Sequence, residues 1–139
     1  MQLSTYSGDL ATIDYLSMLV IDIHGAIRSV SLPRAYLSEK VLGDGIGFDA
    51  SNFGYAQVHK SDMVAKPDLS TAFVEEKDGF RILHAFCDVW TTEGEPFDQY
   101  PRTVAKKAVE HLKASGHGEQ AMMLVELEFY VFDDVRYST

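Results

Sequence analysis

The sequence predicts a protein of the α+β class, with a sheet formed first and one well-defined helix after it. Two pairs of strand-like runs lie in the first 90 residues, and one long stripe of helical spacing follows Pro101. The chain has 139 residues, of which 46% are hydrophobic. That is enough apolar side chain for a folded core, in a length that suits one domain of ordinary size.

The first predicted elements are a hairpin and a short helix. Residues 15–23 are rich in β-branched and aromatic side chains, His24 and Gly25 interrupt them, and residues 27–32 resume an alternating pattern. This arrangement is typical of a β-hairpin. Pro33 ends the second strand, and apolar side chains at roughly helical spacing predict a short helix over residues 34–42.

A glycine-rich segment separates this hairpin from a second pair of strands. Four glycines fall within residues 43–54, so we expect a loop there that uses backbone angles closed to other residues. Residues 71–75 and 80–90 have the composition of two further strands, joined by a turn at Lys77-Asp78-Gly79.

The last third of the chain begins at a connector. Residues 93–101 contain a glycine and two prolines, and we place a boundary between two parts of the chain there. An amphipathic helix is predicted to start at Pro101, to carry one apolar stripe and to stop at Gly116. Residues 121–132 read AMMLVELEFYVF, and this strongly apolar run predicts one more strand.

The composition disfavours several functions. A formal charge of −9, spread along the chain, disfavours nonspecific binding to nucleic acid or to anionic membranes. The single cysteine, Cys87, excludes an internal disulfide framework and a cysteine-rich zinc site, and its apolar setting is typical of a buried small hydrophobe. Because no run is long enough to span a bilayer and no signal peptide is recognisable, we expect a soluble, cytoplasmic protein.

Common nucleotide and hydrolase motifs are missing or stand in the wrong context. Residues 45–50 match G-x-G-x-x-A in letters, but turn-like residues follow where a dinucleotide-binding fold needs a helix. Neither a P-loop nor a G-x-S-x-G nucleophile elbow occurs. The histidines lack metal-ligand spacing, and we expect surface or capping roles for them. They are His24, His59, His84, His111 and His117.

Four acidic residues are candidates for chemistry. Residues i and i+2 of a strand project to one face, so Glu126 and Glu128 would present two carboxylates side by side, with apolar neighbours buried on the other face. Such a pair suits Mg²⁺ or Mn²⁺, but it also suits the solvated face of an amphipathic strand, and spacing leaves both interpretations open. Asp49 and Asp62 lie among turn-forming residues, where aspartate commonly bonds backbone N–H groups.

Several short motifs follow one another in a recognisable order. They are Gly47-Phe48-Asp49-Ala50-Ser51-Asn52, Ser61-Asp62-Met63, Pro67-Asp68, Thr71-Ala72, Cys87-Asp88, Pro101-Arg102, Glu126-Leu127-Glu128-Phe129 and Phe132-Asp133. In this order and approximate spacing they resemble the N-terminal region of glutamine synthetases, most closely the bacterial class I type. The resemblance covers nearly the whole chain from about Tyr15 onward.

This resemblance implies both a fold and an activity. The implied fold is a β-grasp-like N-terminal domain over residues 1–100, followed over residues 101–139 by a linking helix and the first strand of an incomplete catalytic domain. The implied activity is that of an ATP-dependent glutamate–ammonia ligase, in which ammonia displaces phosphate from γ-glutamyl phosphate. Two divalent ions, Mg²⁺ or Mn²⁺, would neutralise the phosphates.

The same resemblance implies roles for individual residues. Glu126 and Glu128 match the first pair of metal-binding glutamates. Asp49 matches the aspartate that binds ammonium and helps to deprotonate it, in the active site of a neighbouring subunit. Ser51 and Asp62 match substrate-binding loop residues near that interface. The implied partners are other copies of the chain or full-length subunits, with glutamate, ammonium and ATP as substrates of the complete enzyme.

Departures from the family's pattern bear on activity. The usual Phe-Asp-Gly-Ser-Ser is replaced by FDASN at residues 48–52, and Leu124-Val125 stands where Gly-Pro commonly precedes Glu-x-Glu. The family's remaining metal ligands, and the arginines that hold phosphate and glutamate, lie beyond Thr139. We therefore expect an inactive isolated chain that binds metal weakly. Two alternatives stay open, a noncatalytic interaction module and part of a ligase for another amine.

Overall fold

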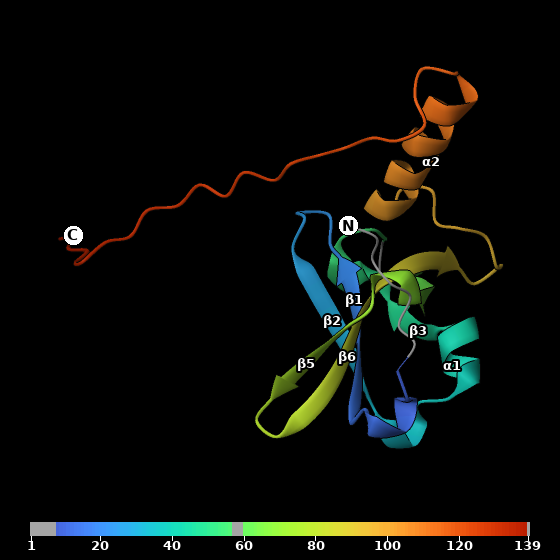
Figure 1. The fold of residues 1–139 in the computed structure, drawn as a ribbon, viewed down its shortest axis with the longest axis horizontal. Coiled ribbons are helices and arrows are strands. Elements are labelled where there is room, and N and C mark those ends of the chain that lie inside the picture. Colours follow the sequence, from blue (N-terminus) through green and yellow to red (C-terminus); the bar gives the residue numbers. More distant parts are fainter. Residues whose placement is uncertain (1–7, 57–59, 139) are drawn as a thin grey trace.

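The computed structural model describes residues 8–56 and 60–138, and a six-stranded mixed sheet dominates it (Figure 1). The strands are β1 (Tyr15–Ile21), β2 (Ile27–Pro33), β3 (Ile46–Asp49), β4 (Asp62–Pro67), β5 (Phe73–Lys77) and β6 (Phe80–Thr91). The α-helices are α1 (Glu39–Asp44) and α2 (Pro101–Ala114). Among these residues, no helix has the length and apolar character needed to cross a membrane.

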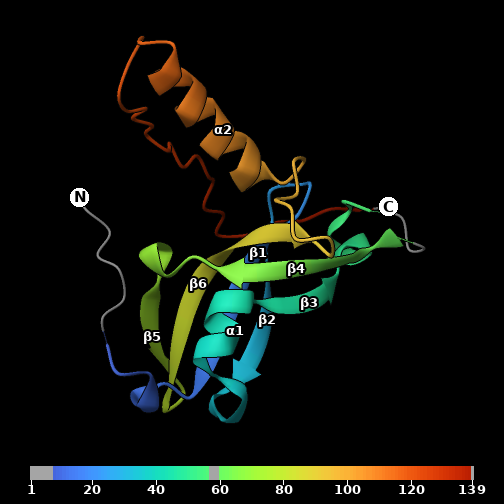
Figure 2. The ribbon, with the colours of Figure 1, turned by 90° about the vertical axis from the view of Figure 1, so that its right-hand side faces the viewer.

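The long strand β6 holds the sheet together. The strand order is β2-β1-β6-β4-β3, and β5 pairs with β6 beside this path. The first part of β6 pairs with β1 and β5, and its last part pairs with β4. The β1–β6 pair is parallel and the other pairs are antiparallel, so the sheet is mixed. α1 lies against the sheet near β4, as Figure 2 shows.

The core lies on one face of the sheet, where β6 alternates buried and less buried side chains and the neighbouring strand β1 is buried over residues 16–20. Completely buried residues include Leu16, Met18, Val20, Leu83, Cys87 and Val89. Burial raises the pKa of the Cys87 thiol to about 12, which confirms the expected hydrophobic role. Tyr100 is also completely buried, and its hydroxyl oxygen accepts a hydrogen bond from the Ile21 N–H at 3.2 Å.

The structure confirms the hairpin at residues 15–32 and the strand pair that ends with β6, and it corrects the region between them. The helix expected over residues 34–42 is split into a 3-10 turn, Arg34–Tyr36, and the later helix α1. Within the expected glycine loop lies strand β3, which pairs with the unpredicted strand β4. Gly45 makes this possible because its φ is +80° and a Cβ there would lie 2.2 Å from the Ala65 carbonyl oxygen.

Helix α2 confirms the predicted start at Pro101, and it projects from one end of the sheet rather than lying across a face (Figures 1 and 2). Four charged side chains at its base fix this direction. Arg102 Nη2 lies 2.6 Å from Asp68 Oδ2, and Arg102 Nε lies 3.3 Å from Asp88 Oδ1. Lys106 Nζ lies 2.5 Å from Asp88 Oδ2. Thr103 is the only buried residue of α2, so its apolar stripe is mostly uncovered.

The C-terminal arm (residues 121–138) differs most from expectation, because the strand predicted over residues 121–132 is not formed. The arm runs away from the sheet without helix or strand, and no described segment pairs with it (Figure 1). The apolar side chains predicted to be buried on one face are open to solvent. Leu127 is 82% exposed and Phe129 is 78% exposed. A strand needs a hydrogen-bonding partner, and apolar alternation alone does not provide one.

Candidate functional site

The end of β3 forms the best-defined candidate site, which we call the Asp49 loop (residues 49–54). Asp49 closes β3 and caps the 3-10 turn Ala50–Phe53, because its side chain accepts a hydrogen bond from the Ser51 N–H at 2.9 Å. Gly54 ends the turn in the left-handed conformation, with φ of +80°. The local sequence thus explains the turn, since aspartate is a favoured cap and glycine a favoured stop.

Strand pairing brings Asp62 opposite Asp49. The β3–β4 register places the two residues directly across from each other. The Ala50 N–H donates to the Ser61 carbonyl at 2.8 Å, so the neighbouring Asp49–Asp62 position is a non-hydrogen-bonded pair, in which side chains approach most closely. Both aspartates are exposed. Two carboxylates arranged this way repel each other and attract a cation.

Hydroxyl groups hold the Asp49 carboxylate in its ionised form. Hydrogen bonds from the Ser51 and Ser61 hydroxyls and from the Ser51 N–H lower the pKa of Asp49 below its ordinary value, against a smaller opposing effect of burial. Ser61 itself is buried, with 6% of its surface exposed. The site therefore presents a negative charge at neutral pH.

The end of β1 and the turn after it are hydrogen-bonded to the Asp49 loop and to Tyr55, which follows it. The Ile23 N–H donates to the Phe53 carbonyl at 3.1 Å, and the Tyr55 N–H donates to the Ala50 carbonyl at 3.3 Å. The Tyr55 hydroxyl donates to the Ile21 carbonyl, and burial raises its pKa. These contacts connect the loop to the core strand β1.

A cleft of about 450 Å³ lies beside Asp62. Its lining residues are Tyr55, Ala56, Lys60, Asp62, Met63, Thr91, Thr92, Glu93, Phe97 and Gln99. The lining includes charges of both signs, on Lys60 and Glu93. Hydrogen bonds from the Glu93 backbone and from the Thr91 and Thr92 side chains, with a smaller effect of the Lys60 charge, lower the pKa of the Glu93 carboxyl.

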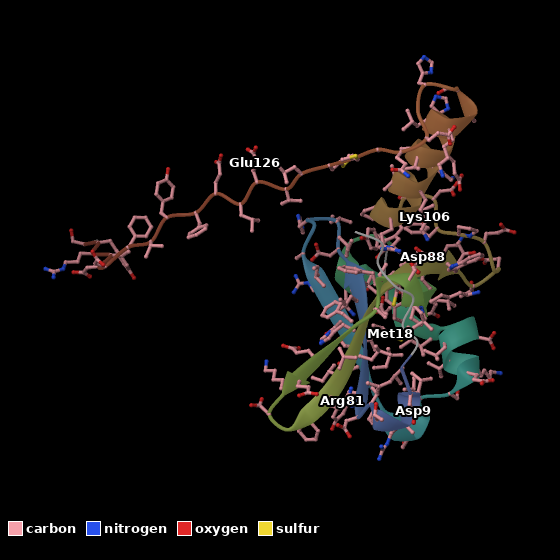
Figure 3. The ribbon with its side chains drawn as sticks, in the orientation of Figure 1. Asp9, Met18, Arg81, Asp88, Lys106 and Glu126 are labelled. Atoms are coloured by element: carbon pink, nitrogen blue, oxygen red, sulfur yellow. The ribbon has the colours of Figure 1, made fainter. Side chains whose placement is uncertain are left out.

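The structure separates the second predicted pair of acids from this site. Glu126 lies on the C-terminal arm, away from the sheet, as Figure 3 shows. No group of three His, Cys, Asp or Glu side chains that could hold a metal occurs within residues 8–56 and 60–138. The role of Glu126 and Glu128 as metal ligands stays a prediction. The predictions that concern His59 and residues 1–7 fall outside the described residues.

The sequence predicts Asp49, Ser51 and Asp62 as site residues. It assigns no role to Ser61 or to the charged residues at the base of α2. The sequence DMVAKP at residues 62–67 has only a short apolar run, and its pairing with β3, which brings Ser61 beside Ala50, is seen only in the structure. No local signal links Asp68 to Arg102, because the two residues lie 34 positions apart in the sequence.

Comparisons with known proteins agree with one another about this fold. The family model described as glutamine synthetase, beta-Grasp domain, matches residues 12–92. A glutamine synthetase of Helicobacter pylori is 34% identical over 126 residues, which cover 89% of this chain and 26% of that protein. One of Rhizobium meliloti is 35% identical over 127 residues, covering 90% and 27%.

The chain belongs to the glutamine synthetase family. Its fold agrees with that assignment, since the cryo-EM structure of Plasmodium falciparum glutamine synthetase superposes with a TM-score of 0.70 at 27% identity. That match covers 79% of this chain and 21% of the other. The predicted β-grasp fold and the predicted family are thus confirmed. The chain spans about a quarter of the length of the curated relatives it matches, 26% and 27% for the two bacterial enzymes.

Proposed function

We propose that this chain supplies the Asp49 loop of a glutamine synthetase, the ligase that joins ammonia to glutamate through γ-glutamyl phosphate at the expense of ATP. The observation that carries the proposal is the ionised Asp49 carboxylate, exposed opposite Asp62 in a chain of this family. A carboxylate binds ammonium through charge-assisted hydrogen bonds. Because its pKa is lowered, Asp49 is a better ligand for the cation than a base, and binding is the larger part of its proposed role.

We further propose that the active site forms between copies of the chain. Asp49 and Asp62 are exposed at the end of the sheet, whereas Glu126 and Glu128 lie on the arm. A site that needs both groups requires a second subunit to bring them together, which supports a homo-oligomer or assembly with full-length glutamine synthetase subunits. Glutamate, ammonium and ATP are the proposed substrates of the complete enzyme.

The proposed metal ligands, Glu126 and Glu128, require partners outside this chain. Mg²⁺ takes about six oxygen ligands, and two carboxylates on an exposed arm supply too few to bind it tightly. We therefore expect weak Mn²⁺ binding by the isolated chain, measured by calorimetric titration. Tight binding that is lost in Glu128→Ala would contradict this.

We also propose residues 1–100 and 101–139 as the two parts of the chain, and the cytoplasm as its compartment.

A chimeric enzyme tests the proposed function. The chain would replace the matching N-terminal quarter of the Helicobacter pylori enzyme, and ATP-dependent glutamine formation would be measured. We expect the chimera to be active and the isolated chain to be inactive, because preorganised groups supply most of the rate in phosphoryl transfer. Asp49→Asn should reduce the activity at least about a hundredfold.

The matched control is Asp44→Asn, which changes an exposed aspartate of α1 that pairs with Lys40. Its activity should equal that of the parent chimera. A chimera that folds and assembles but makes no glutamine would overturn the proposal. Equal activities of the Asp49→Asn and Asp44→Asn chimeras would overturn the role of Asp49.

The exposed arm favours a second candidate function, that of a noncatalytic interaction module. Side chains such as Met122, which is 93% exposed, offer an apolar surface to another subunit. Co-purification of the chain with a full-length relative, without glutamine formation by the chimera, would favour this candidate over the first.

A further inference from the structure

Helix α2 is joined to the sheet more by charged groups than by apolar packing. Of its 14 residues, Thr103 alone is buried. The residue before the helix, Tyr100, is completely buried, and its hydroxyl oxygen accepts a hydrogen bond from the Ile21 N–H at 3.2 Å. A helix with so few buried contacts can tilt about its buried end, so other contacts must set its direction.

Arg102 supplies two of these contacts, because its guanidinium reaches two carboxylates at once. Arg102 Nη2 lies 2.6 Å from Asp68 Oδ2, and Arg102 Nε lies 3.3 Å from Asp88 Oδ1. The guanidinium also lies over the Phe86 ring, 5.9 Å from the ring centroid. Because the three charged side chains are partly buried, solvent screens their contacts less than it screens exposed ion pairs.

The two carboxylates are themselves held in place. Asp68 Oδ1 accepts hydrogen bonds from the Ser70 N–H at 3.1 Å and from the Ser70 hydroxyl at 2.6 Å, which leaves Oδ2 to Arg102. The Asp68 N–H donates to the Phe86 carbonyl at 2.7 Å, and Asp88 lies two residues further along β6. A guanidinium held between two oriented carboxylates restricts both the position and the direction of the element that carries it.

Lys106 lies one turn further along α2 and adds a second cation. Its Nζ lies 2.5 Å from Asp88 Oδ2 and 4.0 Å from Asp68 Oδ2. Figure 3 shows Asp88 and Lys106 next to each other at the base of α2. The two aspartates, Arg102 and Lys106 form a group with balanced charge, which we call the α2 clamp.

The direction of α2 decides where the C-terminal arm begins. An α-helix rises about 1.5 Å per residue, so the 14 residues of α2 extend about 21 Å. A tilt of about 10° at the base would therefore move the far end of α2 by about 4 Å. The arm that follows carries Glu126 and Glu128, and functional groups need to be held within about 0.5 Å of their working positions.

We propose that Arg102 is a positioning residue, whose contacts with Asp68 and Asp88 fix the direction of α2 and thereby the place where the arm begins. The importance of that place for glutamine formation rests on the proposed function, and the fixing of α2 does not. The guanidinium matters as well as the charge, because the ammonium of a lysine lacks the planar fork that bonds both carboxylates.

A distance measurement between two spin labels tests the fixing of α2. The labels would be attached at Ser31→Cys on β2 and at Lys113→Cys near the far end of α2, two exposed positions. Cys87 is completely buried and stays unlabelled. Pulsed double electron–electron resonance, with the labelled chain in an excess of unlabelled chain, reports the distances within one chain. We expect a narrow distribution in the parent and one at least about twofold broader in Arg102→Met, because the far end of α2 then moves by several Å.

Two further variants separate the clamp from a general loss of stability, which would lower the folded fraction without broadening the distances in folded chains. Arg102→Lys keeps the charge and loses the fork, so we expect a distribution of intermediate width. The matched control, Lys107→Met, removes an exposed ion pair with Asp98 from the same helix and should leave the distribution as narrow as in the parent.

The contrary outcomes are equally specific. A parent-like distribution in folded Arg102→Met would overturn the proposal, and one in Arg102→Lys would overturn the need for a guanidinium. If Arg102→Met fails to fold, Asp88→Asn replaces it, because this variant removes the charge of one of the two carboxylates. An unchanged distribution in Asp88→Asn would then overturn the proposal.

The chimeric enzyme separates this inference from the proposed function. In the chimera, Arg102→Met should lower kcat about tenfold and leave KM for ammonium unchanged, because the Asp49 loop belongs to the sheet and not to α2. Lys107→Met should keep the kcat of the parent chimera. If the distances broaden but the Arg102→Met chimera keeps its kcat, α2 is fixed by Arg102 and the role of Arg102 in the reaction is overturned. If the parent chimera makes no glutamine, the proposed function fails, and the distances alone decide whether Arg102 fixes α2.

Discussion

The sheet and the C-terminal arm both carry large apolar side chains, and only the sheet buries them. Met18 on β1 is completely buried, whereas Phe129 on the arm is 78% exposed. β1 has a strand on each side, β2 and β6, while the arm lies beside no strand among the described residues. An apolar run therefore becomes a strand only where neighbouring strands pair with its backbone groups and other elements cover one of its faces.

Ion pairs show the same contrast. The Arg102 side chain is 19% exposed and lies between two aspartates, whereas the Arg136 side chain on the arm is 90% exposed and pairs with its near neighbour Asp134. Partial burial strengthens the first pair, and solvent weakens the second.

Replacing a buried aromatic residue should give the largest difference. Tyr100→Ala removes a completely buried ring that contacts Tyr55, with ring centroids 5.7 Å apart, and it removes the acceptor for the Ile21 N–H. We expect it to lower the free energy of unfolding by about 3–5 kcal/mol. Phe129→Ala should change it by less than about 0.5 kcal/mol. Urea denaturation measures both, and equal losses would contradict the comparison.

The charged pairs should differ less. Arg102→Met removes the contacts of α2 with Asp68 and Asp88, and we expect it to lower the free energy of unfolding by about 1–2 kcal/mol. Arg136→Met on the arm should have no measurable effect. Denaturation at low and high salt tests this, because screening should weaken the parent more than Arg102→Met. A salt response that is the same in both would contradict the assignment.

Acid should weaken the sheet through Asp22. Burial alone raises its pKa, but hydrogen bonds from the Ala26 N–H, Arg28 and the His24 N–H, with the Arg28 charge, together bring it below the ordinary value of 3.8. A lowered pKa in the folded state gives stability that is present above pH 3.8 and lost as the pH falls through the folded pKa. Melting temperatures between pH 6 and 2 should therefore fall less steeply in Asp22→Asn than in the parent.

The control for the acid prediction is Asp134→Asn on the exposed arm, which should keep the parent's pH profile. A parent-like profile in Asp22→Asn as well would assign the acid sensitivity to other groups, such as Asp68, whose pKa is also below its ordinary value.

The arm should affect assembly and leave stability unchanged. Leu127 is 82% exposed, and an uncovered apolar side chain favours association with another chain. We expect self-association of the parent and a monomer mass for Leu127→Lys, with the same free energy of unfolding when it is measured in dilute monomer. Light scattering after size exclusion decides this. A parent mass that stays monomeric at every concentration would contradict association through the arm.

Local sequence patterns were sufficient for several elements whose hydrogen bonds join near neighbours. Alternation predicted the hairpin that became β1 and β2, and Pro101 marked the start of α2. The turn at Asp49 likewise follows from an aspartate, a serine two residues later and a closing glycine. In each case, the groups that make the hydrogen bonds lie within a few residues of one another or across a short turn.

Tertiary pairing decided the rest. The register of β3 with β4 places Asp62 and Ser61 beside Asp49. Gly45 permits the close approach of the two strands. The arm contains the same kinds of residues as a buried strand and remains extended and exposed, because nothing described lies beside it. Periodicity records which face of a segment is apolar, whereas pairing depends on backbone groups from distant parts of the sequence. Motifs and near-neighbour patterns therefore predicted the family, the hairpins and the Asp49 turn, whereas strand pairing between distant segments set which side chains meet beside Asp49.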